Sequence, residues 1–160
     1  MKPLNGIKVI DLTHMLAGPY AGMVIADLGA EVVKVEPLVH GEMTRGLLKS
    51  DPDYSFKEFG AYFLTLNRNK KSVSLDLKSD EGLKVFYDLV KSADVVLNNF
   101  SAGVVKKLKV DFDSLKKINP RIITCSITGF GETGPHSARP AYDQIVQAYS
   151  GAMSITGPDA

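Results

Sequence analysis

Polar and aromatic residues that could hold a ligand follow one of the apolar runs in the sequence. The run ADVVL (93–97) leads into NNF (98–100), and three lysines follow at positions 106, 107 and 109. A planar ring beside amides and a cation suits a nucleotide base and its phosphates. Most lysine clusters are solvated surface, and we expect this for NRNKKS (67–72). The later cluster favours ligand binding only because it follows a strand end.

The junction after the first apolar run, IKVIDL (7–12), is a second candidate anion site. His14 follows the run, and GP (18–19) opens a helix whose free amides would attract a phosphate. Gly18 and Gly22, four residues apart, would let this helix sit close to the sheet. A well-packed strand–helix junction that binds nothing explains the same residues, so both interpretations stay open.

A dinucleotide site is a further alternative, because Glu36 closes the second run where such a fold places its ribose-binding acid. The glycine fingerprint is missing from the preceding junction. A G-x-G-x-x-G pattern occurs at 129–134, but Pro135 and Pro140 follow it, whereas the fingerprint requires a helix there. We predict a glycine-rich loop at this position.

Three other kinds of reactive residue give weaker signals. The histidines, at positions 14, 40 and 136, form no pair at metal-ligand spacing, and we predict no metal site. Cys125 lies in the middle of RIITCSI (121–127), which predicts an inert core thiol, and a single cysteine favours a reducing compartment, the cytoplasm. Tyr142 begins a helix after a loop. Its hydroxyl is either functional or satisfied within a packed environment, and both interpretations stay open.

Five runs rich in Val and Ile have the length and composition of strands covered on both faces. They are IKVIDL (7–12), EVVKVE (31–36), SVSLDL (72–77), ADVVL (93–97) and RIITCSI (121–127). Helix-length segments separate most of them, at 17–28, 81–92, 104–108 and 113–118. The alternation predicts an α/β fold with a parallel sheet and flanking helices.

Two further segments complete this plan. Residues 37–61 contain three Gly and two Pro without a clean period, which predicts a long excursion that is functional or mobile. Ser79 or Asp80 can cap the helix that follows the third run, and a last helix is expected from Tyr142 or Asp143 to about Met153.

Composition limits the classes of function. The 160 residues fit one domain, and 44% hydrophobic with 23% charged residues is typical of folded globular proteins. A formal net charge of +1 provides no field that would attract nucleic acid or an anionic membrane. No apolar stretch approaches the roughly 20 residues of a membrane-spanning helix. We therefore expect neither nucleic-acid nor membrane partners.

Several blocks of the sequence, taken in order, resemble the family III CoA-transferases. This family includes formyl-CoA and crotonobetainyl-CoA transferases, with α-methylacyl-CoA racemase as a relative. The blocks are LNGIKVIDLTHMLAGPYAGMVIADLGAEVVKVE, YFLTLNRNKKSVSLDLKSDEG, ADVVLNNF, NPRIITCSITGFGETGP and RPAYDQIVQAYSGAMSITG. The resemblance covers nearly the whole chain and implies the N-terminal, CoA-binding part, residues 1–160, of a Rossmann-like large domain.

The resemblance also implies acyl-CoA as substrate, a carboxylic acid as its partner in the exchange, and interlocked dimers or a complementing second chain. Family CoA contacts fall on four segments and one lysine of this chain. They are His14, Met15, Leu16 and Ala17; Leu75 to Lys78; Asn99, Phe100 and Ser101; Lys107; and Pro140, Ala141, Tyr142 and Asp143.

Departures from the family pattern affect specificity and catalysis. Formyl-CoA transferase has Gln at the position of Leu16 and a CoA-contacting Arg at that of Pro37. Neither its oxalate/formate specificity nor the CoA contact of that Arg therefore carries over. Racemases have a catalytic His where this chain has Tyr142, which favours a transferase with Tyr142 in a supporting role. The resemblance puts the nucleophilic Asp beyond Ala160, since Asp159 comes too early, and the 160-residue chain alone is expected to be inactive. A non-catalytic or split CoA-binding module, a racemase relative and a dinucleotide oxidoreductase fragment remain alternatives.

Overall fold

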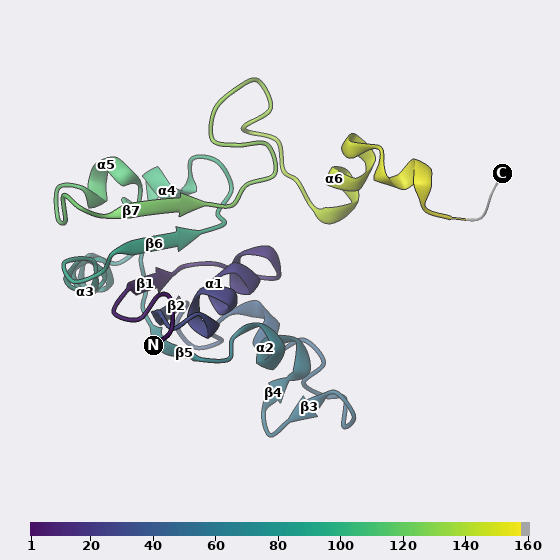
Figure 1. Ribbon diagram of the computed structural model, residues 1–160, viewed down its shortest axis with the longest axis horizontal. Coiled ribbons are helices and arrows are strands. Elements are labelled where there is room, and N and C mark those ends of the chain that lie inside the picture. The colour runs from purple at the N-terminus through teal and green to yellow at the C-terminus, as the bar shows by residue number, and fades with distance from the viewer. Residues whose placement is uncertain (158–160) are drawn as a thin grey trace.

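Five parallel strands form the central sheet of the computed structural model, which describes residues 1–157 (Figure 1). They are β1 (Lys8–Asp11), β2 (Glu31–Glu36), β5 (Lys70–Ser74), β6 (Val95–Asn98) and β7 (Ile123–Ser126). Their order across the sheet is β5-β2-β1-β6-β7. The chain starts in the middle, moves to one edge and then builds the other half, as in doubly wound nucleotide-binding folds. The predicted Rossmann-like α/β architecture is confirmed.

Helices cover the two faces of the sheet unequally. On one face α1 (Ala17–Asp27) packs over β1 and β2 around Val9 and Val32. On the other face α3 (Asp80–Val90), α4 (Val104–Lys107) and α5 (Phe112–Leu115) surround a larger core centred on Phe86, whose side chain is fully buried. Ser79 caps α3 as expected, since its hydroxyl oxygen accepts a hydrogen bond from the Gly82 amide at 3.0 Å.

The excursion between β2 and β5 contains short elements that the sequence pattern did not predict. These are a 3-10 turn, η1 (Met43–Arg45), an antiparallel hairpin of β3 (Ser55–Phe56) and β4 (Phe59–Gly60), and α2 (Ala61–Leu66). Arg45 fastens this region to the sheet, because its guanidinium bonds to Glu36 and lies 3.9 Å from the centroid of the Phe63 ring.

The last described elements lie away from the sheet. In Figure 1 the segment after β7 runs outward to α6 (Asp143–Ser150) and a 3-10 turn, η2 (Ala152–Ile155). The helix was expected to reach Met153 but ends earlier, because Gly151 adopts a left-handed conformation with φ of 79°. Among residues 1–157, no helix combines the length and apolarity needed to cross a bilayer.

Two expectations for the edge strands are wrong. The sequence predicts the third strand at 72–77, but β5 ends at Ser74, and Leu75 and Leu77 instead pack against the core. Cys125 was expected to be a core thiol but is exposed. In the register of β6 and β7, Cys125 lies opposite Leu97, so both residues are on the face of the sheet that α1 covers. Helix α1 packs on β2 and β6, however, and leaves this face of the edge strand β7 open.

Candidate functional site

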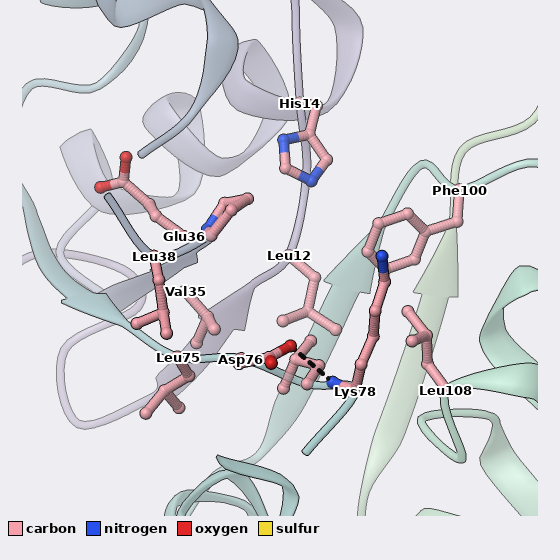
Figure 2. Close-up of a pocket in the computed structure, with 12 residues that line it drawn as sticks. Leu12, His14, Val35, Glu36, Leu38, Leu75, Asp76, Lys78, Phe100 and Leu108 are labelled. Atoms are coloured by element: carbon pink, nitrogen blue, oxygen red, sulfur yellow. Dashed lines mark hydrogen bonds between the residues drawn. The ribbon is translucent and has the colours of Figure 1, made fainter. Parts of the chain in front are cut away.

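A cavity of about 310 Å³ lies at the carboxyl edge of the sheet, where β1, β2, β5 and β6 end (Figure 2). This is where open parallel sheets bind their ligands. Its size is near the lower end of the roughly 300–1,000 Å³ range of small-molecule sites. The lining is mainly apolar and consists of Leu12, His14, Val35, Glu36, Pro37, Leu38, Leu75, Asp76, Leu77, Lys78, Phe100 and Leu108.

Six of the residues predicted to bind CoA are brought together in this lining. They come from three different strand ends and are His14, the segment Leu75 to Lys78, and Phe100. The rings of His14 and Phe100 lie 5.7 Å apart between centroids, at an angle of 48°. Figure 2 shows both rings on the same side of the cavity, with Lys78 extending toward Phe100. The cavity therefore combines a planar aromatic wall with an exposed ammonium group.

Asn99 does not line the cavity, but it holds the backbone of His14, which does. Its side-chain oxygen accepts from the amide of His14 at 2.9 Å, and its side-chain nitrogen donates to the carbonyl of His14 at 2.7 Å. This pair of bonds joins the β1–α1 turn to the end of β6. Burial lowers the pKa of His14, and the positive charge of Lys34 lowers it further, so its ring is an uncharged partner at neutral pH.

Buried charges support the same turn from inside the fold. Asp11, the last residue of β1, is fully buried and lies 2.9 Å from the ammonium nitrogen of Lys70 and 4.0 Å from that of Lys34. Lys34 also donates to the carbonyl of Thr13 at 2.7 Å. Desolvation lowers the pKa of Lys70. The expectation that its cluster is solvated surface is thus wrong for Lys70, because it neutralises a buried carboxylate.

Two glycines allow helix α1 to approach this charged group. A Cβ atom on Gly18 would lie 2.3 Å from Cβ of Thr13, and one on Gly22 would lie 2.7 Å from a carboxylate oxygen of Asp11. Neither distance is compatible with a side chain. The predicted close contact between helix and sheet is confirmed, and it serves the packing of the first strand–helix junction.

Glu36 forms part of the cavity wall, yet its carboxylate is fully engaged within the protein. It accepts two bonds from Arg45, both at 2.6 Å, one from the hydroxyl of Ser72 at 2.6 Å and one from the amide of Glu42 at 2.8 Å. Burial alone would raise the pKa of Glu36, but these bonds lower it to about 2. A ribose hydroxyl would have to displace one of them, which argues against the dinucleotide interpretation.

The remaining predicted residues lie outside the cavity lining. Met15 and Leu16 form the exposed turn before α1, and Ala17 is the exposed first residue of that helix. Ser101 and Lys107 are exposed after β6. Tyr142, 77% exposed, precedes α6, and Pro140, Ala141 and Asp143 accompany it away from the sheet. The structure therefore brings the first three predicted segments near one edge but does not bring the fourth to the cavity. Asp159 lies outside the described residues.

Sequence reasoning missed part of the cavity wall. Leu12, Val35, Pro37, Leu38 and Leu108 line it without having been proposed as binding residues. The first four lie at or just after the ends of predicted strands, so the rule that ligands gather at carboxyl ends could have found them. The prediction of a loop at the glycine-rich pattern 129–134 is confirmed, because no helix or strand lies between the end of β7 at Ser126 and the start of α6 at Asp143.

Known proteins with similar sequences match this chain along nearly its whole length. The profile of CoA-transferase family III matches residues 4–160. A mouse succinyl-CoA:glutarate CoA-transferase is 45% identical over 99% of this chain and 36% of its own length. A succinate–glutarate CoA-transferase of Agrobacterium fabrum is 47% identical over 98% of this chain and 40% of its own length.

A solved structure supports the same relationship. A CAIB/BAIF family protein from Brucella suis superimposes with a TM-score of 0.89 at 44% identity, covering 98% of this chain and 41% of its own chain. The chain thus spans about two fifths of the length of the proteins it matches. The family profile covers well over half of the chain. The chain belongs to CoA-transferase family III.

Proposed function

We propose that this chain provides the acyl-CoA site of an enzyme that transfers CoA between an acyl-CoA and a carboxylic acid. The observation that carries the proposal is the cavity at the carboxyl edge of the sheet, with His14, Leu75, Lys78 and Phe100 in its lining. Its volume of about 310 Å³ suits one end of CoA, with the rest of the molecule extending outside.

The cavity has separate features for a base and for phosphates. The apolar side chains Leu12, Val35 and Leu75 provide buried contact area, and the Phe100 ring provides a face on which a purine base can stack. Lys78 and Lys107 are exposed cations after β5 and on α4, and they would neutralise phosphate groups that leave the cavity. The arrangement therefore suits the nucleotide end of CoA better than its acyl end.

The transfer itself requires a carboxylate nucleophile. Its oxygen attacks the thioester carbonyl carbon, the carbon–sulfur bond breaks, and CoA leaves as the thiolate. The thiolate then attacks the enzyme's carbonyl in the mixed anhydride and releases the acyl carboxylate. The acceptor acid attacks the resulting enzyme thioester, and the same steps run in reverse. Within the cavity, Glu36 cannot serve as this nucleophile, since four hydrogen bonds occupy its carboxylate.

The expectation that the nucleophile is an aspartate beyond Ala160 comes from the family resemblance. Tyr142 is proposed as a supporting residue that orients the acyl group or donates to the developing oxyanion. Its hydroxyl is available, because 77% of the residue is exposed. A Tyr142→Phe change in a full-length protein with this N-terminal sequence should lower kcat, and unchanged turnover would remove Tyr142 from the mechanism.

The partners and the location follow the same reasoning. The names of both similar enzymes pair succinyl or succinate with glutarate, which supports a carboxylic acid as acceptor. A homodimer, or a second chain that completes the enzyme, is proposed from the resemblance and from the apolar side chains that α6 and η2 expose. Cys125 cannot pair within the chain, which supports the reducing cytoplasm.

Calorimetric titration of the chain with CoA, and separately with NAD, tests the assignment. CoA is expected to bind and to shift the amide signals of His14, Lys78 and Phe100, whereas NAD should leave them in place. Binding of NAD with no response to CoA would instead support the oxidoreductase alternative. If a folded sample responds to neither compound, the proposed function is wrong.

A further inference from the structure

The turn that carries His14 is held in an unfavourable backbone conformation. Met15 has a φ of 66°, in the left-handed region that residues other than glycine rarely occupy. Nothing in its own side chain compensates, because Met15 is 41% exposed. Such a conformation persists only where surrounding contacts enforce it. The contacts on this turn therefore decide where the His14 ring points.

Side chains from three separate segments bond the backbone of this turn. Lys34, from β2, donates to the carbonyl of Thr13 at 2.7 Å, and Asn99, after β6, bonds both backbone groups of His14. Glu42, from the excursion, accepts from the amide of Met15 at 2.9 Å. Three consecutive residues are thus fixed from outside, and Glu42 holds the one with the strained φ.

Glu42 is an unusual residue for this task. Its side chain is fully buried, and besides the Met15 amide it accepts a hydrogen bond from the hydroxyl of Thr44. A buried carboxylate is costly unless cations lie nearby, and the charges of Lys70 and Arg45 both interact with it. Its own amide donates to Glu36, so the same residue links the cavity wall to the turn.

We propose that Glu42 is a positioning residue of the acyl-CoA site: by holding the Met15 amide it keeps the His14 ring against Phe100 at the cavity. The proposal rests on the proposed function, since the ligand is the one assigned above. Glu42 itself does not line the cavity, and its effect on binding passes through the turn.

Three variants separate this role from a contribution to stability alone. Glu42→Ala removes the acceptor for the Met15 amide. Glu42→Gln keeps it, since a glutamine oxygen accepts from the amide and its NH2 group can donate to Thr44. Thr44→Val removes the other hydrogen bond of Glu42, at an equally buried residue, but leaves the Met15 contact in place.

The measurements are CoA affinity by calorimetry and, without ligand, the proton shifts of the His14 ring, which report its distance from Phe100. Glu42→Ala is expected to weaken CoA binding by about tenfold, the equivalent of one lost charge-assisted bond, and to move the His14 ring signals. Glu42→Gln and Thr44→Val should stay within about threefold of the wild type and leave these signals in place. If Glu42→Ala does not fold, Glu42→Met fills a similar volume without the hydrogen-bonding carboxylate.

The outcomes distinguish this proposal from the assignment of the ligand. Equal losses of affinity in Glu42→Ala and Thr44→Val, or unchanged His14 signals in Glu42→Ala, would overturn the positioning role while leaving CoA binding intact. If the wild-type chain does not bind CoA, the proposed function fails, and with it the link from Glu42 to that ligand.

Discussion

The ion pair between Glu36 and Arg45 should make the stability of this fold depend on pH in the acid range. The pKa of Glu36 is lowered from 4.5 to about 2. A difference of this size, at about 1.4 kcal/mol for each pH unit, amounts to about 3 kcal/mol of folding free energy. Because the folded pKa is the lower one, this contribution is complete above the unfolded pKa of 4.5 and is lost as the pH falls toward 2.

A Glu36→Gln change tests this reasoning by urea unfolding at a series of pH values from about 7 down to about 3. At neutral pH the variant should be less stable by about 3 kcal/mol, since the half-buried Arg45 guanidinium loses its counter-charge. The difference should shrink as the pH falls below 4.5, because the wild-type carboxyl then binds a proton in the unfolded state while it is still ionised in the folded one. The matched control is Glu31→Gln on the same strand, whose ion pair with Lys71 is exposed and should matter little. A difference that stays constant across this pH range would refute the explanation.

Three other predictions concern the cap, the core and the proposed ligand. Ser79→Ala should destabilise the chain by about 1 kcal/mol in chemical unfolding, because the Gly82 amide loses its acceptor; an unchanged midpoint would contradict the capping role. Phe86→Ala should cost about 3–5 kcal/mol, since its fully buried ring leaves a cavity in the larger core, and a loss below about 1 kcal/mol would show that the core refills. Lys107→Ala should weaken CoA binding about three- to fivefold in calorimetry, whereas Lys106→Ala, equally exposed on the same helix, serves as the control and should not.

The sequence predicted the elements whose signals are local. Ser79 and the apolar stripe that includes Leu83 and Phe86 predicted α3, and its start agrees within one residue. Strand ends marked the turns that carry His14 and Phe100 as two candidate sites, and the structure brings the two rings together because parallel strands have their carboxyl ends at one edge. These inferences needed only periodicity and the topology of a parallel sheet.

The features that sequence reasoning missed depend on contacts between distant segments. Glu42 lies in an excursion that has no periodic pattern, and it contacts Met15, which is 27 positions away in the sequence. The residues next to Glu42 in the sequence therefore do not indicate this contact. Lys70 looked like one of several surface lysines, and only the fold shows that it faces Asp11. Cys125 looked buried because its run is apolar, but the pattern of a single strand does not reveal how far a helix extends across the sheet.

The open face of β7 has a practical consequence. Cys125 is the only cysteine in the chain, it is accessible in the folded state, and it does not belong to the cavity lining. A maleimide dye should therefore attach at one defined position without denaturant and leave the ligand cavity free. The same accessibility allows two molecules to crosslink through oxidation, so samples handled without a reductant should accumulate covalent pairs that have nothing to do with physiological assembly.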